Sequence, residues 1–272
     1  MVLSSTAQHL LASYDQVSQV TPDQIPDDLT VEAAATIVDE IRQARQNRGE
    51  KPVGYKIGFT NRTIWARYGV HHPIWGPIYD TTLTMLDGSD AGNINPTDFT
   101  EPRLEPEIVV CLRHSPLDAS VDAVSDAVAW VAHGFEIVQS VYPGWQFTGA
   151  QSFAAQALHG SLLVGPRIDA ADLAQGRPLA KVLSGLHLSL YKNGAKEPVD
   201  QGQGANVLDG PIQALAHLVQ AKLDQGETLQ TGSIITTGTI TDAQVLVAGD
   251  RWQSQLDNID GLSGLNLAVG HG

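Results

Sequence analysis

The chain has 272 residues, of which 42% are hydrophobic and 17% charged, and this composition suits a globular protein with one large core. Its formal net charge of −14 at pH 7 repels nucleic acid phosphates and anionic lipid, so we expect no nucleic acid and no membrane partner. Cys111 is the single cysteine, which excludes an internal disulfide. The N-terminal residues show no signal peptide and no apolar span of membrane length, so we expect a cytoplasmic protein.

The first part of the chain is predicted to be helical. Residues 4–16 and 30–47 carry apolar side chains at three- and four-residue spacing, and Thr30 can cap the second helix. A polar, proline-containing connector, TPDQIPDD, separates the two helices.

After Gly49 the sequence changes to short apolar runs separated by turn residues. It predicts strands at 53–59, 108–113, 135–141 and 161–165, an amphipathic helix at 121–134, a short helix at 150–160, a turn at Asn193-Gly194, a helix starting near Pro211, and further strands to the C-terminus. Scattered short strands with a few helices predict an α+β fold around a large, mostly β core.

Two acidic residues, Glu105 and Glu107, open the apolar run RLEPEIVVCL. Residues two apart on a strand point to the same face, and Pro106 favours the extended conformation that this needs. Adjacent carboxylates repel each other, so solvent, Arg103 or a divalent cation must compensate them. Glu136 lies in a second apolar strand, and three glutamates fit an oxygen-ligand site for Mg²⁺ or Mn²⁺. The alternative is a solvated strand edge with Arg103 as ion-pair partner.

Lys56 interrupts the apolar strand VGYKIGF between two glycines. A lysine among apolar residues must reach water, an anion or a carboxylate, or titrate near neutral pH. The alternative is a solvent-facing residue of an alternating strand.

Several ordered segments resemble one family. VGYKIGFTN, GPIYD, EPRLEPEIVVCL, HGFEIVQSVYPGW, ALHGSLLVG, GQGANVLDGPIQALAHL and TTGTITDAQVLVAGD are similar, in that order, to motifs of the 2-keto-4-pentenoate hydratase and 4-oxalocrotonate decarboxylase branch of the fumarylacetoacetate hydrolase superfamily. The resemblance extends from about residue 31 to residue 269. It implies a mixed β-sandwich or β-roll core with flanking helices, in a homo-oligomer. We place a helical N-terminal region at 1–50 and the catalytic core at 51–272.

The resemblance also implies roles for individual residues. Glu105, Glu107 and Glu136 fall on the metal ligands, for Mg²⁺ or Mn²⁺, and Lys56 on the catalytic lysine. Asp80 falls on an acidic position near the pocket, which we expect to take part in catalysis.

Further residues are expected to bind substrate. Thr239 falls on the hydroxyl residue at the substrate carboxylate, and Arg103 either anchors a carboxylate or braces Glu105. Gln156 and His159 are expected to line the pocket. For His159 the alternative is a helix-end residue that bonds backbone carbonyls.

Two departures from the family pattern bear on the reaction. Ala155 and Gln156 stand where the family usually has an acidic residue, and Gln139 and Val141 replace an acid and a base. The first change puts hydratase chemistry in doubt, because the missing carboxylate could orient a neighbour or carry a proton.

The resemblance predicts a metal-dependent hydratase of short 2-hydroxy-2,4-dienoates, giving 4-hydroxy-2-oxo acids in the breakdown of aromatic compounds. One alternative is a 2-oxo-3-hexenedioate decarboxylase, which needs a further basic group such as Arg62 or Arg67. The other is a relative that binds a 2-oxo acid without turnover. In each case the partner is a small-molecule 2-oxo or 2-hydroxydienoic acid.

Overall fold

The computed structural model describes residues 3–271, apart from 63, 64, 69, 71 and 87. The helices and 3₁₀ turns of that part are α1 Ser5–Gln16, η1 Pro22–Gln24, α2 Val31–Asn47, α3 Trp65–Tyr68, η3 Pro96–Asp98, α4 Val121–Asp126, η4 Pro143–Trp145, α5 Gly149–Ala154, η5 Gln156–Leu158, α6 Ala170–Ala174, α7 Leu179–Ser184, η6 Gly204–Asn206 and α8 Pro211–Asp224. None of the helices in this described part is long and apolar enough to cross a membrane.

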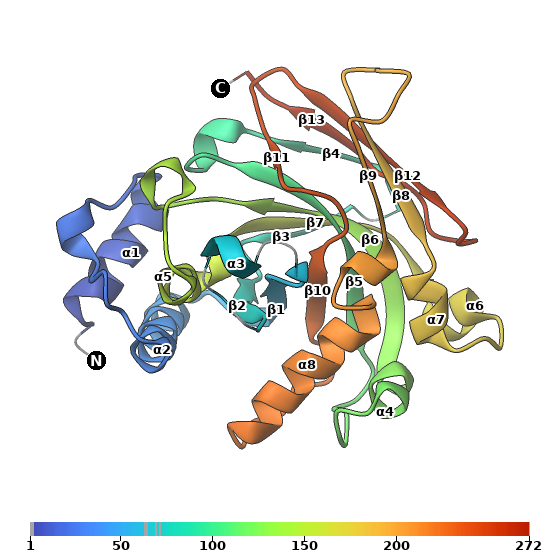
Figure 1. The fold of residues 1–272 in the computed structure, drawn as a ribbon, viewed down its shortest axis with the longest axis horizontal. Helices are drawn as coiled ribbons and strands as arrows, with labels where there is room; N and C mark the ends of the chain where they lie inside the picture. The colour runs from blue at the N-terminus through green and yellow to red at the C-terminus, as the bar shows by residue number, and fades with distance from the viewer. Residues whose placement is uncertain (1–2, 63–64, 69, 71, 87, 272) are drawn as a thin grey trace.

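The strands form two sheets. They are β1 Pro52–Gly58, β2 Ile74–Tyr79, β3 Leu83–Met85, β4 Ala91–Ile94, β5 Arg103–Leu112, β6 Val128–Val138, β7 His159–Asp169, β8 His187–Lys192, β9 Asp200–Gln203, β10 Ile234–Thr239, β11 Gln244–Val245, β12 Arg251–Asp257 and β13 Asn266–Val269. The large sheet has the order β2-β1-β10-β5-β6-β7-β3, with β11 also paired to β5, and the small sheet has the order β4-β13-β12-β8-β9. This mixture of sheets and helices confirms the predicted α+β class (Figure 1).

The large sheet curls into a roll, because β2 also contacts β7 across the sheet. Alternate residues of each strand therefore face the inside of the roll. Inside, an apolar cluster that we call the plug fills one end, and its buried members are Ile78, Val109, Ala132, Leu162 and Val164.

The outer face of the roll carries the main core. Apolar residues of β5 and β6 pack there against the small sheet and against α6, α7 and α8, and Ile108, Phe135, Leu188, Leu215 and Trp252 are buried examples. His133 links the two sheets, since its ring nitrogens lie 2.9 Å from the Glu107 carbonyl oxygen and 2.8 Å from Ser254 Oγ.

The N-terminal helices match their predicted positions. Thr30 Oγ1 accepts a hydrogen bond from the Ala33 amide at 3.2 Å, which confirms the expected cap of α2. Both helices pack onto the segment between β6 and β7 in one apolar cluster that includes Leu10, Ile41 and Phe153. The boundary at residue 50 stays a prediction.

The helix predicted at 121–134 is wrong beyond its first turns. Helix α4 ends at Asp126 and residues 128–138 form β6, which pairs with β5 on one side and β7 on the other. A central strand buried on both faces has a nearly continuous apolar sequence, which short-range periodicity cannot separate from a helix. The helix predicted at 150–160 also ends early, at Ala154.

Candidate active site

The three predicted glutamates converge inside the roll directly beside the plug, because Glu136 on β6 pairs with Leu162 on β7. Glu105 and Glu107 share the inward face of β5 with Val109. Glu136 stands directly opposite Glu105 on β6. One carboxylate oxygen from each residue lies within 4.8 Å of the others. Glu107 and Glu136 are wholly buried, and Glu105 is half-buried.

The buried carboxylates are held in fixed orientations. Oε2 of Glu107 accepts hydrogen bonds from the Gly238 amide at 2.7 Å and from the Thr236 hydroxyl. Gly238 has φ 108°, and a Cβ there would lie 1.9 Å from Thr60 Oγ1, so only glycine brings this amide so close. Oε1 of Glu107 is buried and has no hydrogen-bond partner among the described residues.

Glu136 is held by two basic residues. His159 Nδ1 lies 2.8 Å from its Oε1, and Lys56 Nζ lies 3.3 Å from its Oε2. Behind it, His159 Nε2 lies 2.9 Å from Thr82 Oγ1.

This donor set fits a divalent cation. It offers hard carboxylate oxygens from two strands, and the unpartnered Oε1 of Glu107 lies among them. A buried oxygen without a partner is costly, and a bound cation would remove that cost.

Burial and mutual repulsion dominate the titration of the cluster. Burial, opposed by Lys56 and reinforced by Glu136, raises the pKa of Glu105 to about 7. Burial and the neighbouring carboxylates raise the pKa of Glu107 well above its usual range. For Glu136 burial acts upward, but Lys56 and His159 outweigh it and the pKa is lowered.

Lys56 is 3% exposed, so the solvent-facing alternative for this residue is wrong. Burial lowers the pKa of Lys56, but Glu136, Glu105 and Glu107 outweigh that effect and the pKa lies above its usual value. Without a cation on the carboxylates, Lys56 is therefore an ammonium ion. A divalent cation would offset the negative charge of the same carboxylates. The pKa of Lys56 would then be lower, and Lys56 would give up its proton more readily.

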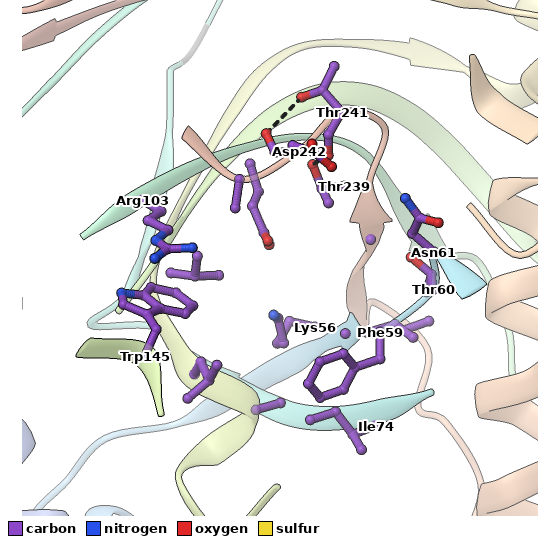
Figure 2. A pocket seen from close by; sticks show the side chains of 18 of the residues that line it. Lys56, Phe59, Thr60, Asn61, Ile74, Arg103, Trp145, Thr239, Thr241 and Asp242 are labelled. Carbon is purple, nitrogen blue, oxygen red and sulfur yellow. Dashed lines mark hydrogen bonds between the residues drawn. The ribbon is translucent and has the colours of Figure 1, made fainter. Parts of the chain in front are cut away.

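A cavity of about 290 Å³ opens over this cluster. Lys56, Glu105, Arg103 and Thr239 line it. Figure 2 shows Lys56 pointing into the cavity, with Arg103 and Trp145 on one side and Thr60 and Asn61 on the other. The Arg103 guanidinium carbon lies 4.0 Å from the centroid of the Trp145 ring.

The apolar part of the cavity wall comes from segments that are far apart in the sequence. Its side chains are Ile57, Phe59, Ile74, Val138, Trp145, Phe147, Ala157, Leu158 and Ala243. Sequence reasoning gave no cavity role to Phe59, Ile74, Val138, Ala157 and Leu158. It also missed Thr241 and Asp242, which lie together on the Thr239 side of the cavity (Figure 2).

Asp80 does not lie in the cavity, so its expected place near the pocket is wrong. It is exposed just after β2, where its Oδ1 accepts a hydrogen bond from the Lys51 amide at 2.9 Å. In the β1–β2 pair Lys56 stands opposite Gly76, whereas Tyr79, beside Asp80, stands opposite Pro52. Asp80 is therefore at the far end of the hairpin from Lys56.

Gln156 and His159 also lie outside the cavity lining, which corrects their expected direct contact with substrate. Both are buried. Gln156 Oε1 accepts a hydrogen bond from the Tyr79 hydroxyl at 3.2 Å, and His159 supports Glu136 as described above.

Of the basic residues considered for a second carboxylate, Arg62 forms an exposed ion pair with Asp209, with N–O distances of 2.8 and 2.9 Å. The side chain of Arg67 lies outside the described part of the structure.

A rolled sheet with three convergent carboxylates and a buried lysine beneath a cavity fits the divalent-metal site of an enzyme. Residues 77–265 match the family model described as fumarylacetoacetate (FAA) hydrolase C-terminal, and the chain belongs to that family.

Similar proteins of known activity fall into two groups. The chain is 32% identical to a 4-oxalocrotonate decarboxylase from Pseudomonas sp over 90% of this chain and 91% of that protein. It is 28% identical to a 2-keto-4-pentenoate hydratase from Paraburkholderia xenovorans over 93% and 90% of the two chains.

Solved structures give the same fold. The 4-oxalocrotonate decarboxylase from Pseudomonas putida G7 complexed with magnesium and adipate matches with a TM-score of 0.85 at 26% identity, over 97% of this chain and 95% of that chain. A second structure of that enzyme, complexed with calcium and acetate, matches with a TM-score of 0.84 at 25% identity, over the same shares of both chains. The predicted fold and branch are thereby confirmed, and relatives of both activities share them.

Proposed function

We propose that the protein is a divalent-metal-dependent lyase of short unsaturated 2-oxo acids. The observation that carries this proposal is the convergence of Glu105, Glu107 and Glu136 beside Lys56, under an enclosed cavity. These glutamates would hold Mg²⁺ or Mn²⁺, and a bound divalent ion supplies a Lewis acid for the carboxylate and keto oxygens of a 2-oxo acid.

The protein's own residues would then do three things. The hydrogen bonds from Gly238 and Thr236 orient Glu107, while His159 and the ion pair with Lys56 orient Glu136. Lys56 reaches the cavity and delivers a proton to a substrate carbon. The apolar wall excludes water from the carbon chain.

Between the two reactions of the relatives, we favour decarboxylation of a short 2-oxo-3-enedioate. Such a substrate needs a cation for its second carboxylate, and Arg103 lies at the cavity wall two residues from Glu105. Two residues on a strand span about 7 Å, comparable with the length of a short dioic acid. The relative complexed with adipate, a dioic acid, adds support. The absence of an acid at Ala155 and Gln156 removes one group that hydration could use.

Hydration of a 2-hydroxy-2,4-dienoate is the second candidate. Thr241 and Asp242 line the cavity, and a carboxylate there can take a proton from water. The hydratase relatives add support at somewhat lower identity.

One experiment separates the two candidates. Purified protein with Mg²⁺ is given 2-oxo-3-hexenedioate or fresh 2-hydroxypenta-2,4-dienoate, while ultraviolet absorbance and released CO₂ are followed. The favoured proposal predicts CO₂ from the first substrate and a rise in its KM of about tenfold or more in Arg103→Gln. Loss of dienoate absorbance without CO₂ would instead support the hydratase. Turnover of neither substrate, with metal still bound, would favour a non-catalytic relative.

A further inference from the structure

Three consecutive residues next to the cavity have left-handed backbone conformations. The φ angles are 53° at Gln156, 51° at Ala157 and 64° at Leu158. Residues with a side chain rarely adopt this conformation, and a run of three persists only when its surroundings hold it in place. Ala157 and Leu158 line the cavity, so this left-handed turn, residues 155–158, forms part of its apolar wall.

The first support comes from the N-terminal helix α1. The hydroxyl of Tyr14 donates a hydrogen bond to the carbonyl oxygen of Ala155. The same oxygen accepts from the Leu158 amide at 2.8 Å, which closes the turn. Tyr14 therefore donates to the same carbonyl oxygen that accepts the hydrogen bond of the turn.

The second support comes from β2 and α2. A Cβ at Gly76 would lie 2.2 Å from the Gln156 carbonyl oxygen, so β2 packs directly against the turn. The Tyr79 hydroxyl donates to Gln156 Oε1 at 3.2 Å, and the Arg45 guanidinium carbon lies 3.9 Å from the centroid of the Tyr79 ring. Figure 1 shows the N-terminal helices α1 and α2 beside α5, which leads into the turn.

We propose that Tyr14 is a positioning residue that sets the cavity's width at Ala157 and Leu158, so that the N-terminal helices select which carbon chains the cavity accepts. This inference rests on the proposed function, because it takes the ligands to be 2-oxo acids. The turn shares the apolar wall with Phe59 and Ile74, and that wall would contact the hydrocarbon part of a bound acid. The position of the turn should therefore affect which lengths and branching patterns of carbon chain are bound, and should have less effect on binding of the 2-oxo acid group.

The test compares two tyrosines that make the same kind of bond. Tyr142 also donates its hydroxyl to a buried backbone carbonyl, that of Gln151, at 2.8 Å, but it bonds no atom of the left-handed turn. Tyr14→Phe and Tyr142→Phe each lose one such bond and keep their rings. Binding of pyruvate and of 2-oxohexanoate to full-length protein with Mg²⁺ is measured by calorimetry.

We expect Tyr14→Phe to change the ratio of the two Kd values by about fivefold, with the Kd for pyruvate nearly unchanged. Tyr142→Phe should leave the ratio as in the wild type. Tyr79→Phe, which releases the turn from its other side, should act in the same direction as Tyr14→Phe and serves if Tyr14→Phe does not fold.

Each outcome is decisive. An unchanged ratio in folded Tyr14→Phe and Tyr79→Phe overturns the inference and leaves the proposed function intact. An equal change of the ratio in Tyr142→Phe also overturns it, because the effect would then be a general loosening. If the wild type binds neither acid, the proposed function fails, and this inference fails with it.

Discussion

The interior of the roll has an apolar end and an acidic end, which adjoin each other, are made from the same strands and differ completely in chemistry. At the apolar end the plug buries side chains such as Val109 and Leu162. At the acidic end Glu107 and Glu136 are just as completely buried, and Lys56 is nearly so. On β5 one two-residue step separates Val109 from Glu107, and Leu162 on β7 pairs with Glu136 on β6.

The comparison shows that equal burial has opposite energetic consequences. Burying Leu162 removes apolar surface from water and stabilises the fold. Burying Glu107 near two other carboxylates raises its pKa and destabilises the ionised state until a cation arrives. The plug therefore provides rigidity, and the acidic end provides a binding site that is stable only when its charge is compensated.

The largest effect is expected at Lys56. Lys56→Met keeps the length of the side chain and removes the ammonium group, so kcat should fall about a thousandfold through loss of the proton donor. Mg²⁺ affinity should not fall, because the removed charge repels the ion. Steady-state kinetics and calorimetry measure both quantities, and a variant with wild-type kcat would remove Lys56 from the mechanism.

A substitution in the plug should lower stability and leave metal binding unchanged. Ile78→Ala leaves a cavity inside the roll and should lower the free energy of unfolding by about 3 kcal/mol. The Mg²⁺ affinity of the folded protein should stay unchanged. Leu117, which is 90% exposed, provides the control, since Leu117→Ala should change stability by less than about 0.5 kcal/mol in urea unfolding. Equal losses in both variants would contradict the account of the plug.

Metal binding should depend on pH. Burial raises the pKa of Glu105 to about 7 when no cation is present, and a cation binds only its ionised form. Below that pH the ion must displace at least the proton of Glu105, so the apparent Mg²⁺ affinity should fall by about tenfold or more per pH unit. Calorimetry from pH 5.5 to 8 in two buffers of different ionisation enthalpy measures affinity and proton release. A flat profile would contradict this charge balance.

The smallest effect is expected at Asp80, outside the roll. Because Asp80 is exposed and bonds the Lys51 amide, Asp80→Ala should change kcat/KM by less than about twofold. A loss of activity comparable with that of Lys56→Met would restore Asp80 to the catalytic residues.

Local rules were enough to predict the glutamate pair and the first helices. The same-face rule for residues two apart brought Glu105 and Glu107 together, and the cap at Thr30 marked the start of α2. Glu136 and Lys56 were singled out as charged residues within other apolar strands, and the family resemblance assigned them to the same site. Their place beside the pair depends on strand order, which spacing within one strand cannot show.

The residues missed or misplaced all depend on contacts distant in sequence. Residues 128–134 became a strand because β5 and β7 pair with them on both sides. Tyr14 reaches Ala155 across 141 positions, and no pattern near either residue indicates that bond. Gln156 and His159 were assigned to substrate from their neighbourhood in sequence, whereas the register of β6 and β7 directs His159 to Glu136.

The central claim is that three carboxylates from two strands hold one divalent ion. Calorimetric titration of Mg²⁺ into wild-type protein and into Glu107→Gln tests it most directly, because the amide keeps the shape of the side chain and removes its charge. We predict one ion per chain in the wild type and an affinity at least about a hundredfold lower in the variant, with the unfolding transition retained. Equal Mg²⁺ affinity in the two proteins would contradict the claim.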